Sequence, residues 1–185
     1  MADITVVKRD GSQQPFDANK INLTLLAASE GLPDQIAKVA QIAAELQLTL
    51  FDGITTEQLD EALIQTAVQN VKDDPDFDTI AARLLLRTIY QQVLGDYTNE
   101  IELKKLHAQK FPIYIRQAAK ECLLDKRMAD SQLFNLKKLA AALDPSKDSL
   151  SKYLGVVTNR NRYALRRQSG DRKSTRLNSS HSTES

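Results

Sequence analysis

Three cationic side chains and two carboxylates lie within the stretch VVKRDGSQQPFDANKI, residues 6–21. Lys8 and Arg9 directly precede an Asp-Gly pair, which is typical of a tight turn. Asp17 stands where a helix would begin, and Lys20 falls in the first turn of that helix. Ammonium groups at a strand end and at a helix N-terminus can together hold a phosphorylated ligand. A solvated hairpin that binds nothing is the alternative that these residues alone leave open.

Short strands and helices must position these groups. Residues 4–7 are β-branched and apolar and predict a strand, and residues 13–16 predict its returning partner. Asp17 is expected to cap a first helix that turns Ile21 inward and ends at Gly31. The cations would therefore lie on a hairpin and on the helix that follows it.

Apolar periodicity predicts three more helices before Gly95. They cover residues 33–49, a segment capped by Thr55 or Thr56, and residues 77–94. The inward positions expected in the 33–49 helix are Ile36, Val39, Ala40, Ala43 and Leu46. Residues 4–95 are thus predicted to be a mainly α-helical unit, in which a small β-hairpin or sheet caps a four-helix bundle.

The second half of the chain is also predicted to be helical. One helical stretch is expected at 98–127, with an interruption at Phe111-Pro112, and another at 132–143. The segment from Ser149 to Arg167 is predicted to start a further region of the protein. Residues 171–181 match what read-through into a widely used sequencing adapter would encode, so residues 171–185 are expected to be a non-native tail.

Composition excludes several classes of function. The 25 Lys and Arg residues nearly balance the 24 Asp and Glu residues, so bulk attraction to nucleic acid is not expected. No run of about 18 apolar residues predicts a membrane span. One cysteine, Cys122, permits no intramolecular disulfide and fits a reducing compartment. A soluble cytoplasmic protein without nucleic-acid or membrane partners is expected.

Residues 4–95 resemble a known regulatory nucleotide-binding domain, the ATP-cone. The resemblance is carried by VVKRDGSQQPFDANKI, LFDGITTEQLDEAL and DFDTIAARLLLRTIY, in that order. Beyond them, AARLLLRTIYQQVLG and KYLGVVTNRNRYALR are similar to the N-terminal part of the large subunit of class I ribonucleotide reductase. The similarity implies a helical reductase region at 96–145 and a truncated start of the next region at 146–170. The catalytic barrel of that family would be absent from this chain.

The resemblance also implies which residues bind nucleotide. ATP or dATP would be the allosteric effector, with Mg²⁺. Lys8 would contact phosphates, and Thr56 would complete the site. The segment 14–20 would wrap the nucleotide. Its implied contacts are Gln14, Phe16 near the base, and Asp17 and Lys20 as polar groups, with Ile21 lining the slot.

The activity implied for the parent protein is the reduction of ribonucleotides to deoxyribonucleotides. It would need self-association, a radical-generating β subunit, and thioredoxin or glutaredoxin as reductant. No catalytic residue is expected in this chain. The alternatives are a free-standing ATP-cone module and a transcriptional repressor that joins the cone to a zinc ribbon. The repressor needs paired CxxC motifs, whereas this chain has one cysteine.

Overall fold

The computed structural model describes residues 4–95, 99–165 and 176–179. The chain divides into two compact units. Residues up to Thr88, joined by 152–154, form the first unit, and the remaining residues form the second. Helix α4 (Asp76–Leu94) begins in the first unit and ends in the second.

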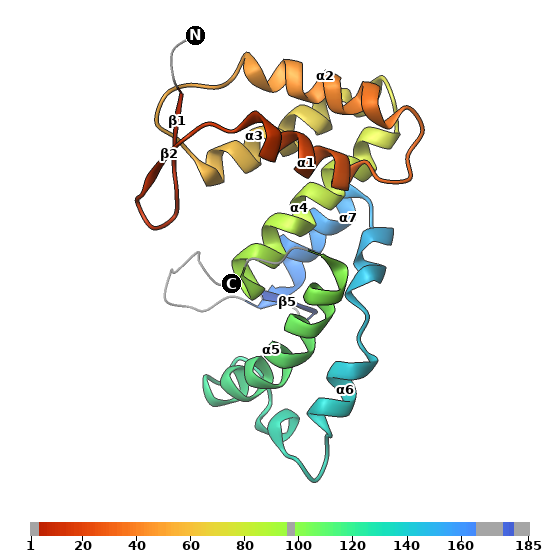
Figure 1. Cartoon of the computed structure of the whole chain (residues 1–185). Helices are drawn as coiled ribbons and strands as arrows, with labels where there is room; N and C mark the ends of the chain where they lie inside the picture. The colour runs from red at the N-terminus through yellow and green to blue at the C-terminus, as the bar shows by residue number, and fades with distance from the viewer. Residues whose placement is uncertain (1–3, 96–98, 166–175, 180–185) are drawn as a thin grey trace. The chain divides into compact units, whose positions relative to one another are not determined.

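A three-stranded sheet opens the first unit. Strands β1 (Thr5–Val7) and β2 (Gln13–Pro15) form the predicted hairpin, and β3 (Ile54–Thr55) pairs parallel to β1 on its other side. The order is therefore β2-β1-β3. Figure 1 shows the hairpin at one end of the helices of this unit, where α1 and α3 begin. The prediction missed β3 because two residues are too few for a periodic pattern.

Four helices follow the hairpin, as predicted. They are α1 (Ala18–Ala28), α2 (Gln35–Gln47), α3 (Thr56–Gln69) and α4, with the short 3-10 helix η1 (Asn70–Lys72) after α3. Thr55 caps α3 through a reciprocal capping box with Gln58. The helices of this unit bury an apolar core that includes Leu25, Ile42, Leu63 and Ile80. Burial of this stripe on each helix is the main favourable term in folding.

The inward face predicted for α2 is wrong at two positions. Ile36 is 81% exposed and Ala40 is also exposed, whereas Ile42 and Lys38 are buried. The buried lysine is tolerated because its Nζ donates to the Pro33 carbonyl at 2.7 Å and lies close to two carboxylates. These ion-pair partners are Asp74 at 2.9 Å and Asp76 at 3.1 Å.

Two polar contacts fasten the edges of the first unit. The backbone N–H of Thr5 donates to Asp52 Oδ1 at 2.9 Å, and the Thr5 hydroxyl donates to the same oxygen. Arg83 on α4 donates through Nη1 to the carbonyls of Ala28 at 3.0 Å and Glu30 at 2.7 Å. The first contact attaches β1 to the turn before β3, and the second satisfies carbonyls at the C-terminal end of α1.

Helix α5 (Glu100–Lys120) dominates the second unit and packs against α6 (Leu136–Ala142) and the 3-10 helix η2 (Lys126–Ala129). The interruption predicted at Phe111-Pro112 is wrong, because α5 runs through Pro112. Pro112 is buried, so apolar packing outweighs the hydrogen bond that the proline ring removes. Helix α5 ends at Lys120, and Cys122 beyond it is exposed with a φ of 60°.

Short elements complete the chain. They are η3 (Pro145–Leu150), α7 (Tyr153–Thr158), the π-helix η4 (Asn159–Tyr163), β4 (Ala164–Leu165) and β5 (Arg176–Ser179). Strand β5 pairs antiparallel with β4. Of the predicted tail, residues 171–175 and 180–185 lie outside the described residues. Within the described residues, no helix is long and apolar enough to cross a membrane.

Candidate functional site

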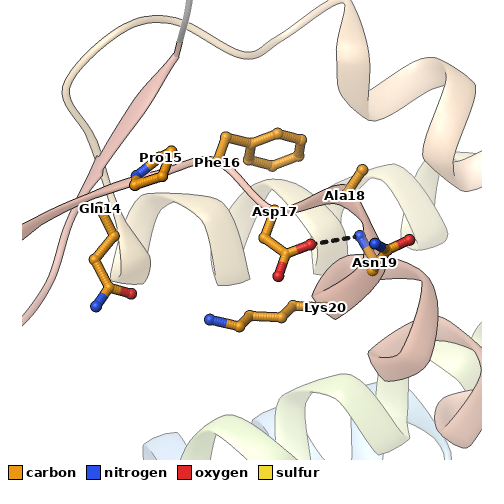
Figure 2. A pocket seen from close by; sticks show the side chains of 7 residues that line it. All are labelled: Gln14, Pro15, Phe16, Asp17, Ala18, Asn19 and Lys20. Carbon is orange, nitrogen blue, oxygen red and sulfur yellow. Dashed lines mark hydrogen bonds between the residues drawn. The ribbon is translucent and has the colours of Figure 1, made fainter.

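An open pocket of about 630 Å³ lies where the hairpin leads into α1. Seven consecutive residues, 14–20, line it. Figure 2 shows the Gln14 amide, the Asp17 carboxylate and the Lys20 amine on one side of this segment, with the Phe16 ring on the other. The polar groups are exposed and Phe16 is half-buried. The structure therefore brings four predicted site residues together around one pocket.

Asp17 caps α1, as the sequence predicts. Its side chain accepts the backbone N–H of Asn19 at 3.0 Å, and its carbonyl accepts the N–H of Lys20 at 3.2 Å. These first-turn donors are therefore already engaged, and a carboxylate occupies the position that an anionic ligand would take. The helix N-terminus contributes less to anion binding than the sequence suggested, and Lys20 is the cation of the pocket lining.

The remaining predicted residues lie elsewhere. Ile21 is buried in the core at 9% exposure. Lys8 follows β1 and Thr56 follows β3, and the register pairs Val7 with Thr55. Since β1 and β3 run parallel, Lys8 and Thr56 leave the sheet side by side at the same edge. None of these three residues lines the pocket.

The hairpin separates Lys8 from the pocket. Phe16 donates its N–H to the Ile4 carbonyl at 2.8 Å, whereas Lys8 donates its N–H to the Ser12 carbonyl at 2.8 Å, next to the turn. Four strand residues, about 13 Å, therefore separate the two ends. Lys8 therefore lies beside the turn of the hairpin, and Lys20 lies beyond its other end, in the first turn of α1.

Two charged residues that the sequence did not single out lie on α3 and α4. Asp60 on α3 follows Thr56 by one helical turn, and Arg87 on α4 donates to the Thr24 hydroxyl on α1. Burial raises the pKa of Asp60 above its ordinary value of 3.8, while the charges of Arg87 and Arg9 oppose that rise. The sequence signal for Asp60 was present, a charged residue one turn after Thr56, but charge on a helix face is usually solvated.

Arg9, in the hairpin turn, also faces α3. Its Nε lies 4.0 Å from Glu57 Oε1. Both side chains are more than a third exposed, so this ion pair adds little stability. It does indicate that the turn carrying the Lys8-Arg9 pair is directed toward the first turns of α3.

The donor set fits magnesium that arrives on a phosphate. Asp17 supplies the one carboxylate of the pocket lining. Among the described residues, no group of three or more metal-ligating side chains is placed to hold an ion. Mg²⁺ binds proteins through one or two carboxylates together with substrate phosphates, so Asp17 can serve as such a ligand.

The arrangement as a whole is a hairpin with cations at both ends, set over the first turns of two helices. The family model described as the ATP cone domain matches residues 4–92. Residues 4–92 are an ATP cone domain. The cone contains the hairpin, all seven predicted site residues, Asp60 and Arg87. The ATP cone is a nucleotide-binding regulatory domain, which fits cations gathered on a hairpin.

Similarity to known proteins continues beyond the cone. The chain is 32% identical to the ribonucleoside-diphosphate reductase subunit alpha of Helicobacter pylori over 164 residues, 88% of its length. It is 26% identical to the ribonucleoside-diphosphate reductase large subunit of Arabidopsis thaliana, over 88% of its own length. It is 25% identical to the ribonucleoside-diphosphate reductase large chain 2 of Saccharomyces cerevisiae, over 87% of its own length. It spans 19%, 19% and 18% of these relatives, respectively, in their N-terminal region.

Proposed function

We propose that this chain is the nucleotide-sensing N-terminal part of a ribonucleoside-diphosphate reductase large subunit. The observation that supports this most directly is the extent of the similarity. It covers 88% of the chain and so includes the residues after the cone, which a free-standing cone module or a repressor would not need. The parent enzyme would convert ribonucleotides to deoxyribonucleotides, and its catalytic residues would lie outside this chain.

ATP and dATP, with Mg²⁺, are the proposed effectors. The phosphates would lie along the hairpin between Lys8 and Lys20, and Gln14, Phe16, Ile21 and Thr56 would contact the nucleotide. Asp17 is the group proposed to sense the ribose 2′-hydroxyl, by which the two effectors differ. Regulation follows only if each effector binds two states of the parent enzyme unequally.

The parent enzyme would also need partners. A radical-generating β subunit, self-association, and thioredoxin or glutaredoxin as reductant belong to this proposal. Relatives named as subunit alpha and large subunit support a second kind of subunit. A cytoplasmic location is part of the same proposal, and the exposed free thiol of Cys122 fits a reducing compartment.

Calorimetric titration of the whole chain with ATP and dATP, each with Mg²⁺, tests the proposed effectors. Saturable binding of both, with different affinities, is expected. UTP is the control for the base, since its phosphates and ribose are those of ATP. Absence of binding heat and of any thermal shift with ATP or dATP would contradict the sensing role.

A further inference from the structure

The charges that line the pocket do not suffice for a triphosphate. Among residues 14–20 the formal charges of Lys20 and Asp17 cancel. Asp17 in addition engages the Asn19 N–H with its carboxylate. A nucleoside triphosphate carries several negative charges, which need cations or N–H donors when water is excluded. The pocket therefore needs a cation from outside its own segment.

Arg87 is joined to the turn of α1 that follows Lys20. Its Nη1 donates to Thr24 Oγ1, and the same hydroxyl donates to the Lys20 carbonyl at 2.9 Å. Thr24 lies four residues after Lys20, on the same face of the helix and about 6 Å along its axis. The guanidinium is thus held one turn behind the pocket cation.

Within the part of the chain that the structure describes, most of the hydrogen-bonding capacity of Arg87 is unused. A guanidinium has five N–H donors, and Thr24 is the hydrogen-bond acceptor that the structure gives it. No carboxylate of the described residues forms an ion pair with Arg87. Burial raises the pKa of Asp60 and the charge of Arg87 opposes that rise, but the two side chains form no ion pair. A half-buried guanidinium with free N–H donors and no ion pair favours an anionic partner. Its paired N–H donors match the geometry of a phosphate group.

We propose that Arg87 is a third cation of the nucleotide site and donates to a phosphate group of the bound nucleoside triphosphate. This inference rests on the proposed nucleotide function. It assigns Thr24 the role of holding the guanidinium toward α1, and it assigns the contact with phosphate to the N–H groups that Thr24 leaves free. Arg87 differs in this respect from Arg83 one turn earlier, which is engaged by two backbone carbonyls.

The test is calorimetric titration of the full chain with ATP and Mg²⁺. Arg87→Gln should weaken ATP binding by about 10- to 100-fold, the value of hydrogen bonds to a charged group. The loss should become smaller from ATP to ADP to AMP as phosphates are removed. The ATP affinity of Arg87→Lys should lie between those of the wild type and Arg87→Gln, because a lysine keeps the charge but loses the paired N–H donors of the guanidinium. Arg116→Gln on α5 is the matched control, since Arg116 is exposed, and should bind like the wild type.

Thr24→Val separates contact with the ligand from an indirect effect on α1. It removes the tether and leaves the guanidinium, so ATP affinity should fall, but by less than in Arg87→Gln. Equal affinity of wild type and folded Arg87→Gln would overturn the inference, and so would a Thr24→Val loss as large as that of Arg87→Gln. If Arg87→Gln does not fold by circular dichroism, Arg87→Lys decides by the same comparison. A wild type that binds no ATP would instead overturn the proposed function, and the inference with it.

Discussion

The carboxylate of Asp17 accepts the backbone N–H of Asn19 at 3.0 Å, at the point where the hairpin enters α1. This hydrogen bond gives Asp17 a structural role that is independent of any ligand. It also places a negative charge where a bare phosphate would otherwise approach the helix dipole. Asp17 therefore suits a hydroxyl or a metal ion better than a phosphate, and its capping role can be separated experimentally from its binding role.

Two substitutions of Asp17 make that separation. Asp17→Ser keeps a good N-cap and should leave the stability nearly unchanged, whereas Asp17→Ala should cost about 1 kcal/mol. In Asp17→Ala the preference between ATP and dATP should fall by about tenfold, because the group proposed to accept the 2′-hydroxyl is gone. Thermal unfolding measures the first effect and calorimetry the second. A wild-type preference retained in Asp17→Ala would remove Asp17 from effector discrimination.

Local signals in the sequence predicted residues 4–95 well. The hairpin, the Asp17 cap, the Thr55 cap and the Gly95 end of α4 are confirmed because each depends on the residues beside it. The errors arose from tertiary contacts. Lys38 is buried because Asp74 and Asp76 reach it from the start of α4, and no periodicity within α2 reveals that. Pro112 remains inside α5 because it is buried.

Only those parts of the candidate site that are formed by consecutive residues were predictable from the sequence. Residues 14–20 are consecutive, so the sequence grouped them correctly around the pocket. Arg87 reaches Thr24 across 63 positions of sequence, and a single sequence carries no signal of such a contact. The position of Lys8 beside Thr56 depends on the parallel pairing of β1 with β3, a strand too short to predict. The roles of all seven predicted residues stay predictions.

Arg83 should matter for stability rather than for binding. Its guanidinium donates to the carbonyl of Ala28, the last residue of α1, and to that of Glu30, just beyond the helix end. Arg83→Ala should lower the free energy of unfolding by about 2 kcal/mol, since charged donors give the stronger hydrogen bonds. Urea denaturation measures it. Arg116→Ala, at an exposed position, should change stability by less than about 0.5 kcal/mol, and an Arg83→Ala effect no larger than that would contradict the capping role.

Acid should loosen the attachment of β1. Hydrogen bonds from Thr5 hold the pKa of Asp52 below its ordinary 3.8. The folded state therefore favours the carboxylate, so this stabilisation is full above pH 3.8 and is lost as the pH falls through the lower folded pKa. Asp52→Asn should remove that pH dependence. In the wild type, the NMR signal of the Thr5 amide should shift as Asp52 is protonated. The same shift in Asp52→Asn would contradict the role given to Asp52.

The stability contributed by Asp60 should depend on pH with the sign opposite to that of Asp52. Burial raises its pKa, so the folded state binds the proton more tightly than the unfolded chain does. Stability contributed by Asp60 is then lost as the pH rises from 3.8 through the raised pKa. Asp60→Asn should therefore stabilise the chain at neutral pH and have no such effect in acid below 3.8. Thermal unfolding at several pH values measures the difference between the two proteins, and a difference that does not change with pH would contradict the burial of a charge.

The central claim is that one nucleoside triphosphate extends along the hairpin and is held at its two ends by Lys8 and Lys20. The most direct measurement is ATP titration of Lys8→Gln, Lys20→Gln and the double variant, with exposed Lys105→Gln on α5 as the control. Each single substitution should weaken binding by about tenfold, and the two losses should multiply because about 13 Å of strand separate Lys8 from the end of the hairpin that leads to Lys20. Lys105→Gln should bind like the wild type. If the folded double variant binds ATP as tightly as the wild type, the hairpin does not hold the nucleotide.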